Sequence, residues 1–321
     1  MYHRILSDTS PCLQLIEPSM FVTRGVFESH IRYLRRHYTI LSLSELLQCG
    51  ARMRLSPRKK YCVITFDDGW ADNYTMAFPI LVRYNVPATI FLPTAFIGTT
   101  RWFWTEQVAY LLSALQLQLP DQRQRFETLS RLKGFGSIGP MMLLSKANGR
   151  HTRRIQRLEL ILTALKQCSP HDIEDFIRLV SGILNISFPA ERHFLTWDEV
   201  NRMSAQGITF GSHSWSHTIL TRVPDGEIER ELHRSWNILQ DRTAAHVPAF
   251  CYPGGEFDDR IKALVLRSGY QAAFGWTGGL ESLPLRDPFA IRRIGVHQEI
   301  SRSPALFSFL LLGITERRID R

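Results

Sequence analysis

The sequence predicts an α/β barrel that carries a helical insertion, and three observations lead to this fold. Short apolar stretches alternate with helix-like stretches along most of the 321 residues, as in a parallel sheet with crossover helices. Seven or eight strands in a chain of this length favour a barrel over an open sheet. The alternation stops over residues 99–194, so this segment is predicted to interrupt a single barrel of residues 1–321.

The strands are expected where short apolar runs end at turn residues, and Pro87 and Pro248 are expected to mark helix-to-strand turns. The helices are expected in the amphipathic stretches between the strands. The predicted strands are Tyr2–Leu6, Tyr38–Leu41, Tyr61–Phe66, Ala88–Leu92, Ile208–Gly211, Ala249–Tyr252, Gln271–Gly275 and Ile291–Val296. The predicted barrel helices are Phe27–Arg36, Leu43–Gln48, Asp72–Tyr84, Trp197–Ala205, Gly226–Asp241, Asp259–Ser268 and Ala305–Ile314.

Several of these helices begin with a recognisable start signal. Ser42 with Glu45, and Thr196 with Glu199, fit the capping box, in which a hydroxyl and a carboxylate each accept a backbone N–H at the helix start. Asp225 is expected to cap the helix that follows it. These signals predict where three of the helices begin.

The insertion of residues 99–194 lacks convincing strands and contains a Gly-rich break at residues 133–140. It follows the strand that ends near Leu92, and the carboxyl ends of the strands form the catalytic face of such barrels. The insertion is therefore predicted to form a lid or one wall of a groove. Its expected helices are Phe103–Leu117, Arg154–Gln167 and His171–Leu184.

The composition, with 44% apolar and 21% charged residues, is typical of a soluble globular protein. No apolar run approaches the roughly 20 residues that span a bilayer, and the N-terminus shows no secretory leader. Five scattered cysteines without a Cys-x-x-Cys motif indicate no disulfide framework. We therefore expect a cytoplasmic protein, unless a leader precedes this sequence.

The formal charge of +9 is unevenly distributed, because residues 98–170 hold eleven Lys and Arg but only four Asp and Glu. Such a segment can attract phosphate-bearing lipids or anionic glycans, so a peripheral contact with a membrane or a lipid-linked substrate is one expectation. A solvated helical surface is the alternative. Nucleic acid is not expected, because aromatic residues are not interleaved with these charges.

Two stretches far apart in the sequence carry side chains suited to hydrolysis. Asp67 and Asp68 follow the apolar run Tyr61–Ile64, so both carboxylates can reach one cleft at a strand end. His213 and His217 lie four residues apart, a spacing that places them on one side of a helical turn. One carboxylate and two imidazoles make an open metal site, and the second carboxylate is then free to take a proton from water.

Each motif alone has a simpler explanation. An Asp pair at a strand end is often a helix cap with a solvated neighbour, and a His pair four residues apart is often a surface coincidence. Because each motif here follows a strand-like run and the two occur together, they favour the metal site.

These stretches resemble the motifs of a known family. Residues 65–69 (Thr-Phe-Asp-Asp-Gly) and 213–217 (His-Ser-Trp-Ser-His) resemble the first two motifs of the NodB-homology polysaccharide deacetylases, carbohydrate esterase family 4. Residues 250–255 resemble the third motif, and residues 1–5 and 87–92 are similar to the family's opening and next strand. The resemblance implies a distorted (β/α)7-type barrel that binds one divalent metal ion, most often zinc, with cobalt or nickel as alternatives.

The resemblance also assigns roles by motif position. Asp67 matches the general base, and Asp68, His213 and His217 match the metal ligands. The backbone N–H of Gly254 matches the group that donates to the oxyanion, in a Pro-Gly-Gly turn that permits close approach to a substrate.

The third motif departs from the family pattern, in which an Arg orients the base, because residues 249–252 contain none. Arg293, from the neighbouring predicted strand, is expected to supply that role, with Arg292 as the alternative. Tyr252, in the third motif itself, is expected to contact the substrate.

The later motifs are weaker. Residues 296–298 (Val-His-Gln) only partly match a fifth motif that normally ends in Leu-His-Asp, whose His is the general acid. His297 is therefore one candidate acid, and His3, from a predicted strand that should end at the same barrel face, is the competing candidate. Trp276 resembles the fourth motif's Trp in position and is predicted to contact the substrate, with simple packing after a strand as the alternative.

The resemblance implies a metal-dependent hydrolase that removes N-acetyl groups from an acetylamino-sugar glycan, either a polysaccharide or a lipid-linked saccharide. The departures motivate an alternative, a non-catalytic glycan-binding barrel that has lost part of the active site. A third hypothesis is hydrolysis of a non-sugar amide on the same barrel. A serine hydrolase is not expected, because the sequence contains no Gly-x-Ser-x-Gly motif.

Overall fold

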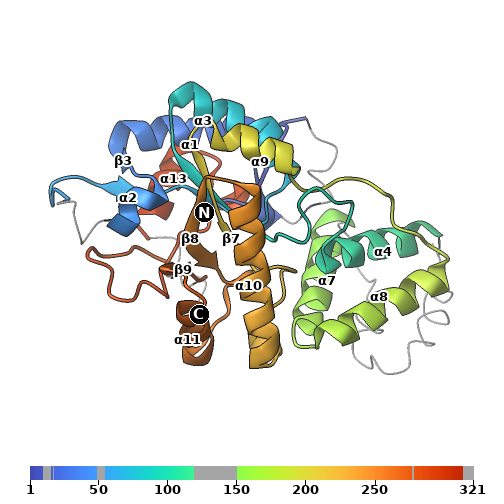
Figure 1. Ribbon diagram of the computed structural model, residues 1–321. Helices are drawn as coiled ribbons and strands as arrows, with labels where there is room; N and C mark the ends of the chain where they lie inside the picture. The colour runs from blue at the N-terminus through green and yellow to red at the C-terminus, as the bar shows by residue number, and fades with distance from the viewer. Residues whose placement is uncertain (10–15, 17, 49–54, 119–149, 277, 314–321) are drawn as a thin grey trace. The chain divides into compact units, whose positions relative to one another are not determined.

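The computed structural model describes most of the chain in two compact units (Figure 1). The first unit comprises Met1–Thr99 and Arg192–Arg321, and the second comprises Thr100–Glu191. The Gly-rich break at residues 133–140 lies outside the described residues, as do several of the basic residues between 119 and 149. The described residues are 1–9, 16, 18–48, 55–118, 150–276 and 278–313.

Five parallel strands form the central sheet of the first unit, and they follow one another across the sheet in chain order. Figure 1 shows β7, β8 and β9 side by side, with the long helix α10 against β7. This arrangement confirms the parallel α/β architecture. The strands are β5 (Thr65–Phe66), β6 (Ala88–Leu92), β7 (Ile208–Ser212), β8 (His246–Cys251) and β9 (Ala272–Phe274).

Single backbone contacts extend this sheet beyond its two edge strands. Tyr2 forms a parallel bridge with β5 at one edge, and Ile291 forms one with β9 at the other. The N–H of Val296 donates to the carbonyl of Met1 at 3.0 Å, so the two extensions meet. The sheet therefore curls into a distorted barrel, as predicted, whose regular strands occupy only part of the circumference.

Two short parallel pairs lie beside the central sheet. The first joins β1 (Arg4–Leu6) to β2 (Phe21–Thr23), a strand that the sequence did not predict. The second joins β3 (Thr39–Ile40) to β4 (Tyr61–Cys62). The predicted strand Tyr61–Phe66 is therefore wrong as a single element, because its first half pairs with β3 and its second half, β5, pairs with β6.

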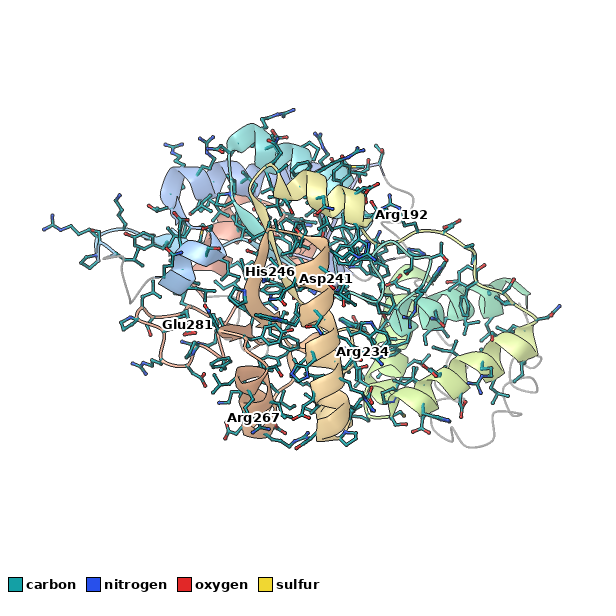
Figure 2. All side chains as sticks on the ribbon, viewed as in Figure 1. Arg192, Arg234, Asp241, His246, Arg267 and Glu281 are labelled. Carbon is teal, nitrogen blue, oxygen red and sulfur yellow. The ribbon has the colours of Figure 1, made fainter. Side chains whose placement is uncertain are left out.

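The predicted strand Ile291–Val296 is wrong as a regular strand. Ile291 forms a single bridge with β9, and Ile294 and Val296 form backbone hydrogen bonds with Met1 only. The N–H of Arg292 donates instead to the side chain of Glu281, which lies in the loop after β9 and is labelled in Figure 2. A backbone donor directed to a side chain cannot continue a strand ladder. The segment consequently follows the barrel without becoming a regular strand.

Two predicted boundary residues have other roles. Pro248 lies inside β8 at an irregularity in its pairing with β7. Phe210 pairs with His246 and Ser212 pairs with Phe250, so β8 has two extra residues between these pairs. This bulge accommodates a residue without an N–H. Asp225 does not cap its helix, because Pro224 is the cap residue and Asp225 begins α10 (Asp225–Arg242) with its carboxylate accepting from Arg260.

The predicted helix Asp72–Tyr84 starts with a π-helical turn at Asn73–Ala77 and continues as α3 (Phe78–Tyr84). The N–H of Phe78 donates to the carbonyl of Asn73, five residues back. Pro79 follows and has no N–H to form the usual bond four residues back. The missing N–H of Pro79 thus favours the wider π-helical turn before α3.

The remaining predicted barrel helices are present within a few residues of their expected bounds. Both capping boxes are confirmed, because Ser42 and Thr196 each exchange hydrogen bonds with the glutamate three residues on. These helices are α1 (Arg24–His37), α2 (Leu43–Gln48), α9 (Trp197–Ser204), α11 (Asp259–Arg267) and α13 (Pro304–Leu311), with the short α12 (Gln298–Ser301) before the last.

The second unit consists of helices around an apolar core. Leu111, Ile161 and Phe176 are fully buried there, one from each helix. A role for this unit as a lid or groove wall stays a prediction. No helix of the described residues combines the length and apolarity needed to cross a bilayer. The helices are α4 (Trp104–Gln118), α7 (Arg150–Leu165) and α8 (Pro170–Leu184).

Candidate active site

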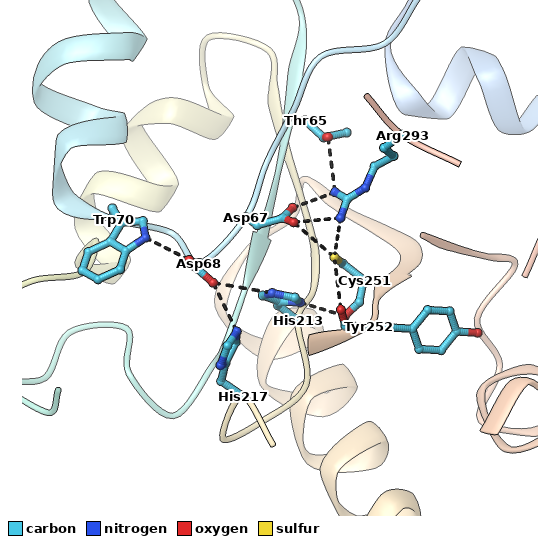
Figure 3. Close-up of polar contacts among 9 residues, drawn as sticks. All are labelled: Thr65, Asp67, Asp68, Trp70, His213, His217, Cys251, Tyr252 and Arg293. Carbon is cyan, nitrogen blue, oxygen red and sulfur yellow. Dashed lines mark hydrogen bonds and ion pairs between the residues drawn. The ribbon is translucent and has the colours of Figure 1, made fainter. Parts of the chain in front are cut away.

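Two adjacent carboxylates lie at the carboxyl end of β5 (Figure 3). Asp67 and Asp68 are only 2% and 4% exposed. Asp68 has a backbone φ of 74° and Gly69 one of 63°, in the left-handed region that residues other than Gly seldom adopt. This sharp turn ends the alternation of the strand, so both neighbouring carboxylates belong to one buried cluster.

His213 and His217 approach Asp68 from the loop after β7. The Oδ1 atom of Asp68 lies 3.5 Å from Nε2 of His213 and 3.3 Å from Nε2 of His217. The prediction that both imidazoles share a helical turn is wrong, because the loop is not helical. Left-handed φ angles of 62° at Ser214 and 60° at His217 bring the two rings together instead.

The three side chains fit a divalent metal ion by chemistry and by spacing. Nδ1 of His213 lies 2.8 Å from the carbonyl of Cys251, which can only accept, so Nδ1 carries the proton and Nε2 is free to bind a metal. Ligand atoms about 2.0–2.1 Å from a tetrahedral ion lie about 3.3–3.4 Å from one another. The two measured separations agree with that spacing. Asp68, His213 and His217 are thus a possible metal site.

The charges in this cluster are strongly coupled. Burial alone would raise the pKa of Asp68, but hydrogen bonds with His213 and His217 outweigh it and hold that pKa well below its usual range. Burial lowers the pKa of His217. Burial acts the same way on His213, but Cys251 and Asp68 raise its pKa well above its usual range. A proton on an imidazole and a divalent cation are therefore alternative ways to neutralise Asp68.

Trp70 completes the surroundings of Asp68 and was not predicted as a site residue. Its indole N–H donates to Oδ2 of Asp68 at 3.0 Å, while Oδ1 faces the imidazoles. A donor on the second oxygen fixes the orientation of a ligating carboxylate. The signal available in the sequence was the position of Trp70, two residues after Asp68.

Asp67 has a different partner. Arg293 donates to both of its oxygens, from Nη1 to Oδ1 at 2.7 Å and from Nη2 to Oδ2 at 2.8 Å. Burial alone would raise the pKa of Asp67, but the charge and hydrogen bonds of Arg293 outweigh it and lower the pKa to about 2. The predicted alternative, Arg292, is wrong, because its side chain is directed to Glu281.

Cys251 lies beside this pair and was not predicted to be in the site. Its Sγ accepts from Nη2 of Arg293 at 3.1 Å and lies 3.5 Å from Oδ2 of Asp67. Asp67, His213 and Cys251 also stand close enough to surround an ion. We favour the Asp68 cluster as the metal site, because both oxygens of Asp67 are already occupied by Arg293.

Four predicted residues line one cavity of the first unit. His3, His297, Trp276 and Arg293 line a cavity of about 170 Å³. Burial lowers the pKa of His3, although Asp68 and Asp67 oppose that shift. The structure thus brings both candidate acids to one cavity that also contains the guanidinium partner of the proposed base.

The third motif forms a short turn whose residues face different ways. Gly254 is exposed and has a φ of 66°, which favours glycine. A Cβ added to Gly255 would lie 2.1 Å from the Cβ of Trp276, so only glycine allows Trp276 to pack here. Tyr252 is not brought to the site by its side chain: the ring points away in Figure 3, and its hydroxyl donates to the carbonyl of Phe289 at 2.9 Å.

The sequence pattern of the family described as Polysaccharide deacetylase matches residues 54–125 and 171–273, more than half of the chain. These residues include the strands and loops that carry Asp67, Asp68, His213 and His217. The chain belongs to the polysaccharide deacetylase family. Membership confirms the resemblance inferred from the motifs.

Individual relatives of this deacetylase family align with shorter segments. The Bacillus subtilis protein YxkH is 34% identical over 109 residues, which cover 34% of this chain and 36% of the relative. The poly-beta-1,6-N-acetyl-D-glucosamine N-deacetylase of Staphylococcus epidermidis is 37% identical over 82 residues, or 25% of this chain and 28% of the relative. The alignments thus span about a third of the length of these curated relatives.

Solved structures of deacetylases share the fold over nearly the whole chain. The Streptococcus pyogenes deacetylase PplD superposes with a TM-score of 0.60 at 18% identity, covering 97% of this chain and 96% of that one. IcaB from Ammonifex degensii superposes with a TM-score of 0.56 at 15% identity, covering 97% and 94%. The likeness confirms a distorted α/β barrel of the deacetylase type.

Proposed function

We propose that this polysaccharide deacetylase family member is a metal-dependent hydrolase that removes N-acetyl groups from an acetylamino-sugar glycan. The observation that carries the proposal is the contrast between two adjacent carboxylates. Asp68 faces two imidazoles, whereas Asp67 is held by a guanidinium. One carboxylate is therefore available as a metal ligand and the other as a general base.

Asp67 is the proposed base, and Arg293 directs its oxygens. A carboxylate with a pKa of about 2 is deprotonated throughout the neutral range, but it accepts a proton efficiently only from an acidified donor. When bound, a divalent ion supplies that acidity by lowering the pKa of water to about 7, and it polarises the acetyl carbonyl. Asp68, His213 and His217 are proposed to hold this ion, with zinc expected and cobalt or nickel as alternatives.

The remaining chemistry needs a donor for the acetyl oxygen and a proton for the leaving nitrogen. The backbone N–H of Gly254, an exposed residue, is the proposed oxyanion donor. His297 is the proposed general acid, with His3 as the competing candidate, and both line the cavity beside Arg293. Trp276 borders the same cavity and is proposed to contact a sugar ring. Tyr252 is not proposed to do so, because its ring is buried.

The names of the staphylococcal relatives support a substrate rich in N-acetylglucosamine. The first test is therefore acetate release from β-1,6-linked N-acetylglucosamine oligomers, with zinc or cobalt added. The proposal predicts release that a chelator abolishes and that added metal restores. A lipid-linked acetylamino sugar is the second substrate to try.

Two outcomes of this test favour the other hypotheses. Binding of the oligomers without acetate release, under every metal condition, would favour the non-catalytic glycan-binding barrel. Hydrolysis of a cyclic amide, with no activity on acetylated glycans, would favour a non-sugar amidase. The pairing of Arg293 with Asp67 argues against the glycan-binding hypothesis, because Arg293 supplies the guanidinium that the third motif lacks.

A further inference from the structure

A buried carboxylate on α10 holds the loop that carries both proposed imidazole ligands. Glu231 is 1% exposed. Its Oε2 accepts from the backbone N–H groups of Trp215 at 2.9 Å and of Ser216 at 2.7 Å, and its Oε1 accepts from the Ser216 hydroxyl at 2.6 Å. Three donors from two successive residues therefore converge on one side chain.

The backbone of this loop has an uncommon conformation that such contacts can maintain. Ser214 and His217, on either side of the two donor residues, both have left-handed φ angles. Successive N–H groups in turns of this kind form a concave site for an anion, and Glu231 provides that anion from within the fold. On the opposite side, the N–H of Ala95 donates to the carbonyl of Trp215 at 2.8 Å. The loop is thus held from two sides.

The same face of α10 makes further contacts with this region. The hydroxyl of Ser235 lies 2.7 Å from that of Ser212, the last residue of β7. Arg234, labelled on α10 in Figure 2, places its guanidinium 4.6 Å from the ring centre of Trp215. Arg234 and Ser235 lie three and four residues after Glu231, so the three side chains are neighbours on one face of α10. This face contacts both the end of β7 and the loop that follows it.

We propose that Glu231 is a positioning residue for the metal site, which keeps Nε2 of His213 and Nε2 of His217 at bonding separation from Asp68. It acts through the backbone of the loop between the two imidazoles. This inference rests on the proposed function, because it takes these three residues to be the metal ligands. Loss of an outer partner that orients ligands typically weakens metal binding by about 10–100-fold.

The test compares zinc affinity, measured by calorimetric titration of the full chain, before and after Glu231→Gln. The amide keeps the shape of the side chain but removes its charge, so the backbone N–H groups of Trp215 and Ser216 lose their charge-assisted acceptor. We expect zinc to bind about 10–100-fold more weakly. Thr243→Val is the matched control, because Thr243 is buried at the end of the same helix and contacts Ser204, away from the loop. Its zinc affinity should equal that of the wild type.

A second variant separates positioning from a general loss of stability. Ser216→Ala removes only the hydroxyl donor, so we expect a smaller loss of zinc affinity, and combination with Glu231→Gln should be less than additive. If Glu231→Gln does not fold, Ser216→Ala decides the question. If the wild type binds zinc and the variants that fold bind it with the same affinity, this inference alone is overturned. A wild-type chain that binds no zinc overturns the proposed function together with it.

Discussion

The two units of the chain differ in what they bury. Among the described residues, every buried polar or charged side chain lies in the first unit, including Asp67, Asp68, His213 and Glu231. The core of the second unit is formed by apolar side chains of three helices. Burying a charge costs stability unless a partner compensates it. The barrel therefore carries the buried, paired charges that chemistry requires, whereas the described core of the helical unit is apolar.

The largest expected effect concerns a proposed ligand in the first unit. His213→Ala should weaken zinc binding by more than the roughly 10–100-fold that loss of an outer partner costs, and it should abolish acetate release. His233→Ala, which changes an exposed histidine of α10, is the control and should change neither. Calorimetric zinc titration of both variants gives the comparison. Unchanged zinc affinity in His213→Ala would remove this residue from the metal site.

The next effect tests whether the buried charge of Asp67 depends on its partner. Arg293→Met leaves a buried carboxylate without compensation and should lower the free energy of unfolding by about 3–5 kcal/mol. Arg292→Met removes a half-exposed arginine paired with Glu281 and should cost about 0–1 kcal/mol. Urea unfolding of chelator-treated protein measures both. Equal effects of the two neighbouring substitutions would contradict the ion pair.

A substitution in the second unit tests how much its apolar core contributes to stability. Phe176→Ala empties a fully buried position and should destabilise that unit by about 3–5 kcal/mol without changing zinc affinity. Leu179→Ala, on the same helix but 37% exposed, should cost much less. Amide hydrogen exchange within residues 100–191 measures the destabilisation. A parallel fall in zinc affinity would show that the barrel's site depends on the helical unit.

The smallest expected effect concerns pH. Burial lowers the pKa of His30 to about 4, while its ring stacks on Phe307 and its Nε2 lies 2.7 Å from the carbonyl of Ser301. In the unfolded chain this histidine has a pKa of about 6.5, so below that pH the unfolded state binds a proton that the native state resists. The stability is therefore complete above about pH 6.5 and falls as the pH decreases towards 4, by no more than about 3 kcal/mol.

His30→Gln should flatten this pH dependence, whereas His37→Gln, at an exposed position of the same helix, should not. The measurement is urea unfolding at several pH values between 4 and 7. Amide hydrogen exchange at the same pH values should show the loss of stability in the first unit but not in residues 100–191. An unchanged slope in His30→Gln would assign the acid sensitivity to another group.

Local patterns predicted much of this structure, because they report on local physics. Both capping boxes, the strand Ala88–Leu92 and most helix bounds depend on residues close in sequence, and the structure contains them. The family motifs led to the buried cluster around Asp68. The wrong elements depend on distant partners: Tyr61–Phe66 divides because its halves pair with different strands, and Ile291–Val296 fails because Glu281 takes its backbone donor.

The site shows the same division. The spacing of His213 and His217 predicted that they meet but not how, because the loop between them has left-handed residues and donates backbone N–H groups to Glu231 of α10. Trp70 was missed although it lies only two residues after its partner Asp68. Glu231 was missed because sequence spacing does not reveal its partners in the loop after β7. Arg293 was found only because the third motif lacked an expected arginine.

The central claim is that two neighbouring carboxylates have separate tasks, and one pair of variants tests it most directly. Zinc affinity and acetate release should be measured for Asp67→Asn and Asp68→Asn side by side. The account predicts that Asp67→Asn binds zinc as the wild type does but releases acetate about 10²–10⁴-fold more slowly, while Asp68→Asn loses zinc binding. Asp67→Asn that turns over at the wild-type rate, or that loses zinc as severely as Asp68→Asn, would contradict it.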